Sequence, residues 1–444
     1  MSWWKTTPSI RQAGSVLFHG RWVARPEDFA FLEKSGIRLG EPSRSEQGGW
    51  SLPLDHRQWG RATLVALPEA PIPPKIVVDF DARLTEDEKA AVGSCRQSLS
   101  VTAEPRTGNV LADRKDLLRF LHAALGEQGV AAVDHTAQAF WSRDALEQEL
   151  SHDAELDIDG IYTLHLVSNR VPEASEGMRP YWLHSHGLRE IGFHDFDVLD
   201  PAEDLGGHAH DLLRAIAFAI VERRLGADGR AFEVVVGERV QPVAARDFLG
   251  RTPSAEYLQY RSSVDDDHLD RHLVLCDAGS ASWFSRLRGK NGPRSSRFLR
   301  GPFPEEVMIH FSSSATELMA KRARQMLDVF REVATEFAEF EFPAMVKLGY
   351  HVDGGGEDDR EHLWFQVHRF VGNRFDATLI NAPFHIARLR EGVRGEHPAD
   401  LMSDWVVLTP FGRIDPRQTR TLRTVRQRKS ELRQMLELAK RGSN

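Results

Sequence analysis

The alternation of apolar and polar residues predicts short strands and amphipathic helices in the first third of the chain. The run Ile76–Phe80 predicts one strand, and the alternating Leu99–Ala103 predicts another. Between them, Thr85 and Glu88 stand at the spacing of a capping box, so we expect a helix to begin there. A second amphipathic helix is expected over Lys115–Leu125. This order predicts a multi-domain α+β fold with mostly antiparallel sheets and helices packed on one face.

The middle of the chain continues this pattern as far as Val240 and then loses it. Ile161–Val167 has apolar residues at alternate positions, and Trp182–His186 predicts a second short strand. Leu212–Arg224 has a nearly continuous apolar middle, which indicates a buried helix. From Arg246 to Pro302 the chain is rich in Ser, Arg, Gly and Asp and shows no apolar period, so we expect an irregular linker.

The last third predicts a long helix, an antiparallel sheet and a basic terminal helix. Thr316–Phe340 places apolar side chains at steps of three and four residues, which is typical of a helix with one buried face. A strand is expected before it at Met308–Phe311, and two more after it at Ala344–Val352 and Leu363–Phe370. Arg417–Arg441 predicts a helix that is basic except for one apolar stripe, formed by Leu422, Val425, Leu432, Leu436 and Ala439.

These changes of pattern divide the chain into five segments. We expect an N-terminal α+β segment at 1–74, central α+β structure at 75–245, the linker at 246–305, a further domain at 306–415 and a basic amphipathic helix at 416–444. A chain of 444 residues is too long for one ordinary hydrophobic core, which agrees with several domains.

The composition favours a folded cytoplasmic protein. Hydrophobic residues make up 41% of the chain and charged residues 27%, as in globular proteins. No apolar run approaches the roughly eighteen residues of a membrane span, and the first residues lack the apolar core of a signal peptide. Cys95 and Cys276 have no metal-type spacing, so we expect two buried thiols in a reducing compartment.

Charge is distributed unevenly along the chain. The formal net charge is −8, but residues 416–444 contain seven Arg and two Lys against Glu431 and Glu437, a balance of +7, so the remainder carries −15. Such a tail is expected either to dock on the chain's own acidic body or to bind an acidic protein or nucleic acid. The residues expected to contact a partner are Arg417, Arg420, Arg423, Arg426 and Arg428.

A cluster of histidines begins within the expected strand Trp182–His186. His184 and His186 are two residues apart, so both point to one face of a strand and could bind one metal ion. The expected divalent-metal ligands are His184, His186, His194, His210 and Asp195, with Asp195 as ligand or base. His208 and Asp197 are alternatives that could complete the site. The alternative is structural: one histidine bonds a backbone carbonyl and the others are exposed. The run Asp265–His268 is also a cation candidate, but such acidic runs are typically solvated.

Common catalytic motifs are absent from the sequence. It contains no Gly-x-Ser-x-Gly, no Walker-type loop and no Gly-x-Gly-x-x-Gly after a strand. The sequence therefore does not decide whether the protein is an enzyme, and it favours a protein without catalytic activity. No cofactor is expected, apart from the metal ion that the histidines would hold.

The segments TELMAKRARQMLDVFREV, AMVKLGYHV, EHLWFQVHRF, DATLINAPFHIARLREG and SDWVV follow one another over about a quarter of the chain. This order resembles the bacterial family catalogued as domain of unknown function 2314. The residues that carry the resemblance are Glu361, His362, Trp364, Asn381, Pro383, Asp404 and Trp405. After Asp404-Trp405 the chain retains only Gly412 of a Gly-rich stretch, and the basic tail departs from the family. Residues 75–240 are more loosely similar to the uncharacterised domains numbered 4026 and 4261.

For the signature residues we expect structural roles. Trp364 packs, Asn381 supports a turn, and Asp404 accepts a backbone or indole proton that fixes Trp405. The alternative is a binding pocket built from Glu361, His362 and Asp404.

Three functions follow from these patterns. The first is an uncharacterised bacterial protein that acts without catalysis, by binding another protein, in an immunity or stress-related accessory role, which the resemblance suggests by association alone. The second is a metal-dependent hydrolase built on His184 and His186. The third is association with nucleic acid through the basic tail, which predicts strongly salt-dependent binding. Nothing in the sequence identifies the partner or the oligomeric state.

Overall fold

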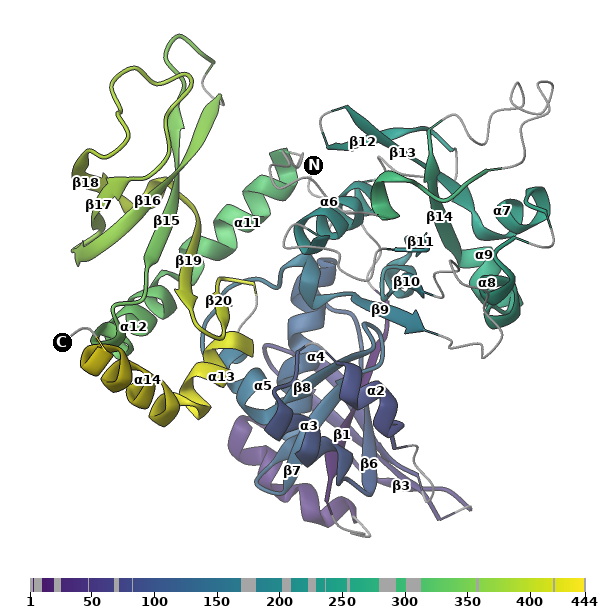
Figure 1. Ribbon diagram of the computed structural model, residues 1–444. Helices are drawn as coiled ribbons and strands as arrows, with labels where there is room; N and C mark the ends of the chain where they lie inside the picture. Colours follow the sequence, from purple (N-terminus) through teal and green to yellow (C-terminus); the bar gives the residue numbers. More distant parts are fainter. Residues whose placement is uncertain are drawn as a thin grey trace.

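The computed structural model describes residues 3, 10–19, 25–46, 48–67, 72–81, 83–168, 181–201, 209–222, 229–235, 237–253, 256–278, 293–300, 313–356, 359–417 and 420–442. These residues form three separate, mostly antiparallel sheets with helices packed against them (Figure 1). The expected α+β class with mostly antiparallel sheets is therefore confirmed.

The first sheet has eight antiparallel strands in the order β2-β4-β5-β6-β1-β7-β8, with β3 paired to β4. The strands are β1 (Gln12–Phe18), β2 (Ile37–Leu39), β3 (Ser43–Arg44), β4 (Trp50–His56), β5 (Gly60–Ala66), β6 (Gln97–Ala103), β7 (Gly129–Asp134) and β8 (Ala139–Ser142). The helices around it are α2 (Lys75–Phe80), α3 (Glu86–Gly93), α4 (Val110–Leu125) and α5 (Arg143–Leu150). Segments 1–74 and 75–150 thus share one sheet, because β1 pairs with both β6 and β7.

One expected strand of this part is wrong. Ile76–Phe80 lies in α2, although its branched residues favour strands. Pro74 stands at the N-cap of α2, and Lys75 forms an ion pair with Asp79 one helical turn later, at 2.6 Å. The expected capping box is confirmed: the Glu88 carboxylate accepts from the Thr85 amide, and the Thr85 hydroxyl accepts from the Glu88 amide.

The second sheet has the order β12-β13-β14-β11-β10-β9. Its strands are β9 (Thr163–Ser168), β10 (Tyr181–His186), β11 (Asp195–Leu199), β12 (Phe232–Val235), β13 (Glu238–Ala244) and β14 (His272–Asp277). Leu183 and Val198 join the core that contains α6 (Ala209–Val221), whereas Trp182 and Val274 join a separate core with Phe248. That second core is formed with the short helices α7 (Ala245–Arg251), α8 (Leu258–Ser263) and α9 (Asp266–Arg271).

The irregular linker expected between Arg246 and Pro302 is therefore wrong over much of its length. It contains α7, α8 and α9, and β14 lies inside the second sheet between β13 and β11. Helices of six or seven residues are too short to show a helical apolar period, which explains why the pattern missed them. Residues 279–292 of the expected linker lie outside the described residues.

The third sheet has the order β18-β17-β16-β15-β19-β20. Its strands are β15 (Ala344–His351), β16 (Arg360–Val371), β17 (Arg374–Leu379), β18 (Arg394–Pro398), β19 (Met402–Thr409) and β20 (Gly412–Ile414). The single helix expected over Thr316–Phe340 is two helices, α11 (Ser313–Gln325) and α12 (Leu327–Glu336), separated at Met326. The apolar stripe continues across the break, so the sequence pattern does not show it. The strand expected at Met308–Phe311 lies outside the described residues.

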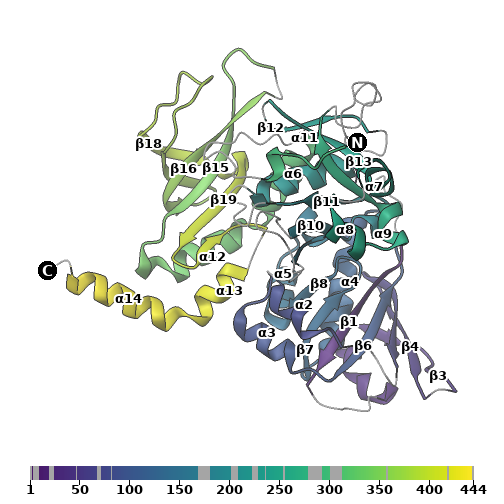
Figure 2. The ribbon, with the colours of Figure 1, turned by 45° about the vertical axis from the view of Figure 1, so that its right-hand side comes forward.

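The basic tail forms two helices, α13 (Arg420–Gln427) and α14 (Lys429–Gly442), instead of one. Leu422, Val425 and Leu432 are buried in the core of the third sheet. Figures 1 and 2 both place α13 between the third-sheet unit and the first-sheet unit, with α14 continuing towards the C-terminus. None of the described helices combines the length and apolar character needed to cross a bilayer.

Candidate metal centre

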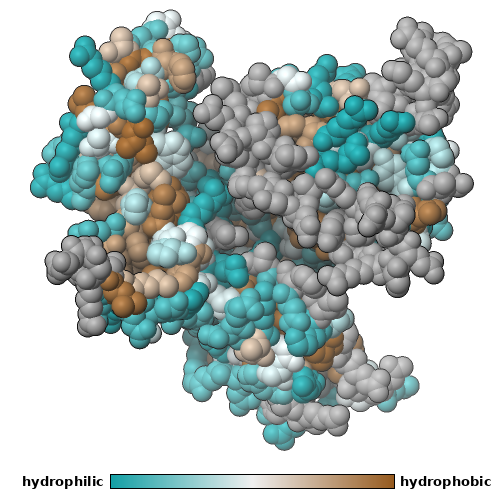
Figure 3. All heavy atoms as spheres, viewed as in Figure 1, coloured by the Kyte–Doolittle hydropathy of each residue, from teal (hydrophilic) through white to brown (hydrophobic). Residues whose placement is uncertain are grey.

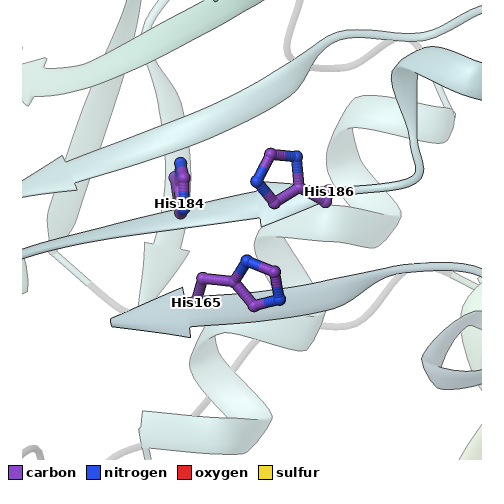
Figure 4. Close-up of side chains that lie close together, drawn as sticks. All are labelled: His165, His184 and His186. Carbon is purple, nitrogen blue, oxygen red and sulfur yellow. The ribbon is translucent and has the colours of Figure 1, made fainter. Parts of the chain in front are cut away.

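The histidines of β10 lie on one face of the second sheet, because residues two apart in a strand point to the same side. His184 and His186 share this face with Trp182, which packs with the core of α7 and α8. His165 of β9 is paired with His184 in the antiparallel register. Figure 4 shows the three rings gathered beside these two strands, and the ring centroids of His184 and His186 are 4.4 Å apart.

Two aspartates extend the cluster across the next strand. Asp197 of β11 is paired with His184, and Asp195 is paired in parallel register with His272, the first residue of β14. His268 lies one turn earlier, in α9, and its ring stacks on that of His272 with centroids 3.6 Å apart and planes at 17°. The sheet register therefore brings together side chains that lie far apart in the sequence.

Within the described part of the chain, the cluster contains three groups that could each hold a metal ion. The first group is His165, His184 and His186; the second is His184, Asp197 and His268; the third is His186, Asp195 and His272. In each group the three ligand atoms lie within 4.8 Å of one another.

Three of the five expected ligands belong to these groups, namely His184, His186 and Asp195. His194 is half-buried and belongs to none of the three groups. His210 lies in α6, and its side chain is outside the described residues. His184, His186 and Asp195 therefore lie together as predicted, but the residues that surround them differ from the predicted ones.

Sequence reasoning missed His165 and His272. It named Asp197 only as an alternative to Asp195, and His268 only as part of the acidic run Asp265–His268. Asp197 carried a usable signal, because strand alternation places it on the same face as Asp195. His268 and His272 lie in the segment that was interpreted as irregular, so their position could not be inferred without β14.

The carboxylate of Asp197 is the main anchor of the cluster. It accepts hydrogen bonds from the Tyr260 hydroxyl at 2.5 Å, from His268 Nε2 at 2.9 Å and from His272 Nδ1 at 3.1 Å. Burial alone would raise the pKa of Asp197, but the hydrogen bonds from His268 and His272 hold this pKa well below its ordinary value. Asp197 is therefore an ionised carboxylate that fixes two imidazole rings.

Several ring nitrogens of the cluster lack a hydrogen-bond partner among the described residues. Among the described residues, His184 Nδ1, His186 Nδ1 and His272 Nε2 are buried and have no hydrogen-bond partner. Burial lowers the pKa of His184 to about 3 and the pKa of His186 to about 2. Both rings are therefore neutral at physiological pH, which is the state in which an imidazole binds a metal. A buried polar atom without a partner is costly, and a bound ion would remove that cost.

Asp195 is held in place by its own neighbours. Its Oδ1 accepts from the Ser185 hydroxyl at 2.6 Å and from the Leu188 amide at 3.3 Å, and its Oδ2 accepts from the Arg189 amide at 3.3 Å. Burial raises the pKa of Asp195 despite these bonds. A nearby cation would lower that pKa again and favour the charged carboxylate.

The cluster is not uniformly closed. His272, Asp195 and Asp197 are almost completely buried, and His184 is 8% exposed. His165 and His186 are only half-buried, so the side of the cluster between β9 and the end of β10 is the more accessible one. A small molecule would reach the ring nitrogens from that side.

The signature residues of the last domain have structural partners. The Glu361 carboxylate accepts from the Phe384 and His385 amides, and Asn381 Oδ1 accepts from the Trp364 amide across the sheet at 2.7 Å. These bonds hold the turn that contains Pro383.

The Asp-Trp element and the neighbouring histidine are held in the same way. Asp404 accepts from the Trp405 amide at 2.9 Å, and the fully buried Trp405 ring stacks on Phe330 at 4.9 Å. His362 Nδ1 lies 2.8 Å from the Ser403 hydroxyl. These contacts support the structural roles rather than a pocket built from Glu361, His362 and Asp404.

The five tail arginines all contact this chain. Arg417 pairs with Asp404 at 2.7 Å, and Arg420 donates to the Leu84 carbonyl at 2.9 Å. Arg423 pairs with Glu88 at 2.8 Å. The remaining two pair with glutamates of the third-sheet unit and of the tail itself: Arg426 with Glu332 and Glu336, and Arg428 with Glu431.

Comparison with known proteins supports the resemblance of the C-terminal part. Residues 315–431 match the family described as "Uncharacterized protein conserved in bacteria (DUF2314)". The matched stretch runs past Asp415 and through α13, so the basic tail does not leave the family where the sequence pattern suggested. No curated protein and no solved structure matches the chain. The matched family carries no assigned activity, and the histidine cluster lies outside the matched residues.

Proposed function

We propose that this protein is a metal-dependent hydrolase that binds a divalent transition-metal ion through His186, Asp195 and His272. The observation that carries the proposal is the state of His272. Its Nδ1 lies 3.1 Å from Asp197 Oδ1, while its buried Nε2 has no partner among the described residues. A hydrogen bond at one ring nitrogen fixes the tautomer and leaves a lone pair on the other, which is how outer carboxylates orient metal-binding histidines.

The donor set supports a zinc-type ion. Two imidazoles and one carboxylate are a common three-ligand set of catalytic zinc sites, in which water takes the fourth position. Imidazole ligands also suit iron, copper and nickel, whereas magnesium and calcium prefer oxygen ligands. Asp195 supplies the oxygen ligand, and its hydrogen bonds to Ser185 and two backbone amides hold it in place.

Hydrolysis is the chemistry that such a centre supports. A zinc ion held by His186, Asp195 and His272 would lower the pKa of a water molecule and so supply hydroxide for the hydrolysis of an ester, amide or phosphoester. Hydrolysis would join the hydroxide oxygen to the carbonyl carbon or phosphorus and break the bond to the leaving group, which would take up the proton of the hydroxide. The half-buried His165 stands at the accessible side of the cluster and is the residue best placed to contact a substrate.

The first test is metal content. The full chain is stripped with a chelator, reloaded with Zn²⁺, desalted and measured by mass spectrometry of the metal. We expect at least one tightly held Zn²⁺ per chain, less in His186→Asn and His272→Asn, and no loss in His194→Ala, which lies next to Asp195 but outside the three groups. A wild-type chain without Zn²⁺ would refute the site.

The second test is activity. Zn²⁺-loaded protein and the same variants are assayed with p-nitrophenyl acetate, p-nitrophenyl phosphate and bis-p-nitrophenyl phosphate. We expect Zn²⁺-dependent turnover of at least one of them, lost in His272→Asn and retained in His194→Ala. Tight Zn²⁺ binding without any turnover would leave a metal-binding protein and refute the hydrolase.

The tail gives less support to the other functions that the sequence suggested. Its five candidate arginines make contacts within the chain, so we place the function at the histidine cluster. Association with a protein or nucleic acid, an immunity or stress-related role and a cytoplasmic location stay predictions from the sequence.

A further inference from the structure

We infer that the centre holds two metal ions, the second bound by His184, Asp197 and His268. This inference rests on the proposed function, because the second ion would stand next to the one bound by His186, Asp195 and His272. The two groups share no residue, so both can be filled at the same time.

The two groups are built in the same way. Each takes one histidine from β10, one aspartate from β11 and one histidine from the α9–β14 segment. The spacing is two residues on β10 and two on β11, so both ligands of each strand point to the same face. On the third segment His268 and His272 are one helical turn apart, and the sheet begins at His272. The sheet register thus produces two matched triads from three pairs of residues.

The triads are close enough to act together. Corresponding members are neighbours: the rings of His184 and His186 are 4.4 Å apart, and those of His268 and His272 are 3.6 Å apart. His165 forms a group with His184 and His186, one member of each triad, so it stands at the junction of the two. Paired ions about 3.5–4 Å apart are typical of hydrolytic enzymes that stabilise both the attacking and the leaving oxygen.

In the second triad, unlike the first, two of the ligands are already hydrogen-bonded to each other. His184 Nδ1 has no partner among the described residues, and the side chain is more than nine-tenths buried. His268 Nε2, however, already contacts Asp197 Oδ2 at 2.9 Å, and Tyr260 donates to the same oxygen. An ion in this triad has to replace the His268–Asp197 hydrogen bond with two metal–ligand bonds. The two ions should therefore bind one after the other, the second with the lower affinity.

The experiment counts ions in the full chain. Chelator-stripped protein is titrated with Co²⁺, whose visible absorption reports coordination, and a parallel sample is loaded with Zn²⁺ for metal analysis. The variants are His268→Gln, which removes only a member of the second triad, His186→Asn from the first triad, and His194→Ala as the control. Far-UV circular dichroism shows whether each variant is folded.

We expect two equivalents of metal in the wild type and in His194→Ala, reached in two phases, and one equivalent in His268→Gln with the tighter phase intact. One equivalent in the wild type overturns the two-ion centre and leaves the proposed function standing. No bound metal overturns both. Two equivalents in a folded His268→Gln overturn the second triad. If His268→Gln does not fold, the number of phases in the wild-type titration decides.

Discussion

Arg322 of α11 forms a two-point ion pair with Glu149 of α5, Nη1 to Oε1 at 3.1 Å and Nη2 to Oε2 at 2.8 Å. Both side chains are buried, and they belong to helices of the third-sheet and first-sheet units. The same guanidinium donates to the carbonyls of Glu155 and Pro416. Burial alone would raise the pKa of Glu149, but Arg322 keeps this pKa below its ordinary value. The junction of the two units therefore contains a buried charged pair beside its apolar contacts.

Removing one partner of this pair should destabilise the protein strongly. Arg322→Met leaves the Glu149 charge buried without its counter-ion, which typically costs about 3–5 kcal/mol. Urea unfolding followed by tryptophan fluorescence would measure the loss. In the double variant Arg322→Met/Glu149→Met both charges are gone, so part of the stability should return. A double variant less stable than Arg322→Met would contradict this explanation.

The contact between Arg423 and Glu88 predicts a dependence of stability on pH. Burial alone would raise the pKa of Glu88, but Arg423 and Ser142 lower this pKa from its ordinary value of 4.5. A carboxylate with a lowered pKa in the folded state stabilises the fold above its ordinary pKa and loses this contribution as the pH falls through the folded value.

The measurement is the difference in unfolding free energy between the wild type and Glu88→Gln. This difference should be full at pH 6–7 and shrink below pH 4.5, the ordinary pKa of Glu88. Other acids titrate in both proteins, so their contributions cancel in the difference. An equal difference at pH 7 and pH 3 would show that the Glu88 charge contributes nothing.

The basic tail is expected to stabilise the third-sheet unit. Leu422 is buried in its core, whereas Leu438 on α14 is 67% exposed. Leu422→Ala should cost about 2–5 kcal/mol, as for other large-to-small changes in a core, and Leu438→Ala should be nearly neutral. Chemical unfolding of the two variants compares the same substitution at a buried and an exposed position. Equal small effects would mean that the tail is not docked.

Metal should stabilise the protein as well. A ligand that binds only the folded state adds about 2.7 kcal/mol when its concentration is 100 times its dissociation constant. Zn²⁺ should therefore raise the unfolding midpoint of the wild type and of His194→Ala. The rise should be much smaller for His272→Asn. A chelator should reverse the shift. An equal rise in all three proteins would indicate nonspecific binding.

Sequence patterns predicted the parts of this fold in which a strand or helix shows its own period. The strands Ala344–His351 and Arg360–Val371 and the capped helix after Thr85 are of this kind. The patterns failed for α2, where a proline and a local ion pair outweighed branched residues, and for β14, which follows three short helices. His184, His186 and Asp195 were found because they are close in the sequence. His165, His268 and His272 join them through the pairing and order of the strands, which the sequence does not show.

Glu361 of β16 binds the loop that follows β17. The carboxylate of Glu361 accepts from the Phe384 amide at 2.7 Å and from the His385 amide at 2.9 Å, while the Phe384 side chain is 87% exposed. Figure 3 shows apolar residues, in brown, on part of the surface of the third-sheet unit.

Glu361→Ala removes both acceptors, so the two amides should lose protection against hydrogen exchange while the core of the sheet keeps it. The substitution Glu391→Ala, at an exposed position of the same loop, is the matched control and should leave the exchange unchanged. Exchange measured by nuclear magnetic resonance or mass spectrometry resolves the loop from the strands. Because Ile386 and Asp353 also anchor this loop, the global stability should change by only about 1–3 kcal/mol. Full protection of both amides in Glu361→Ala would show that the loop is fixed by other contacts.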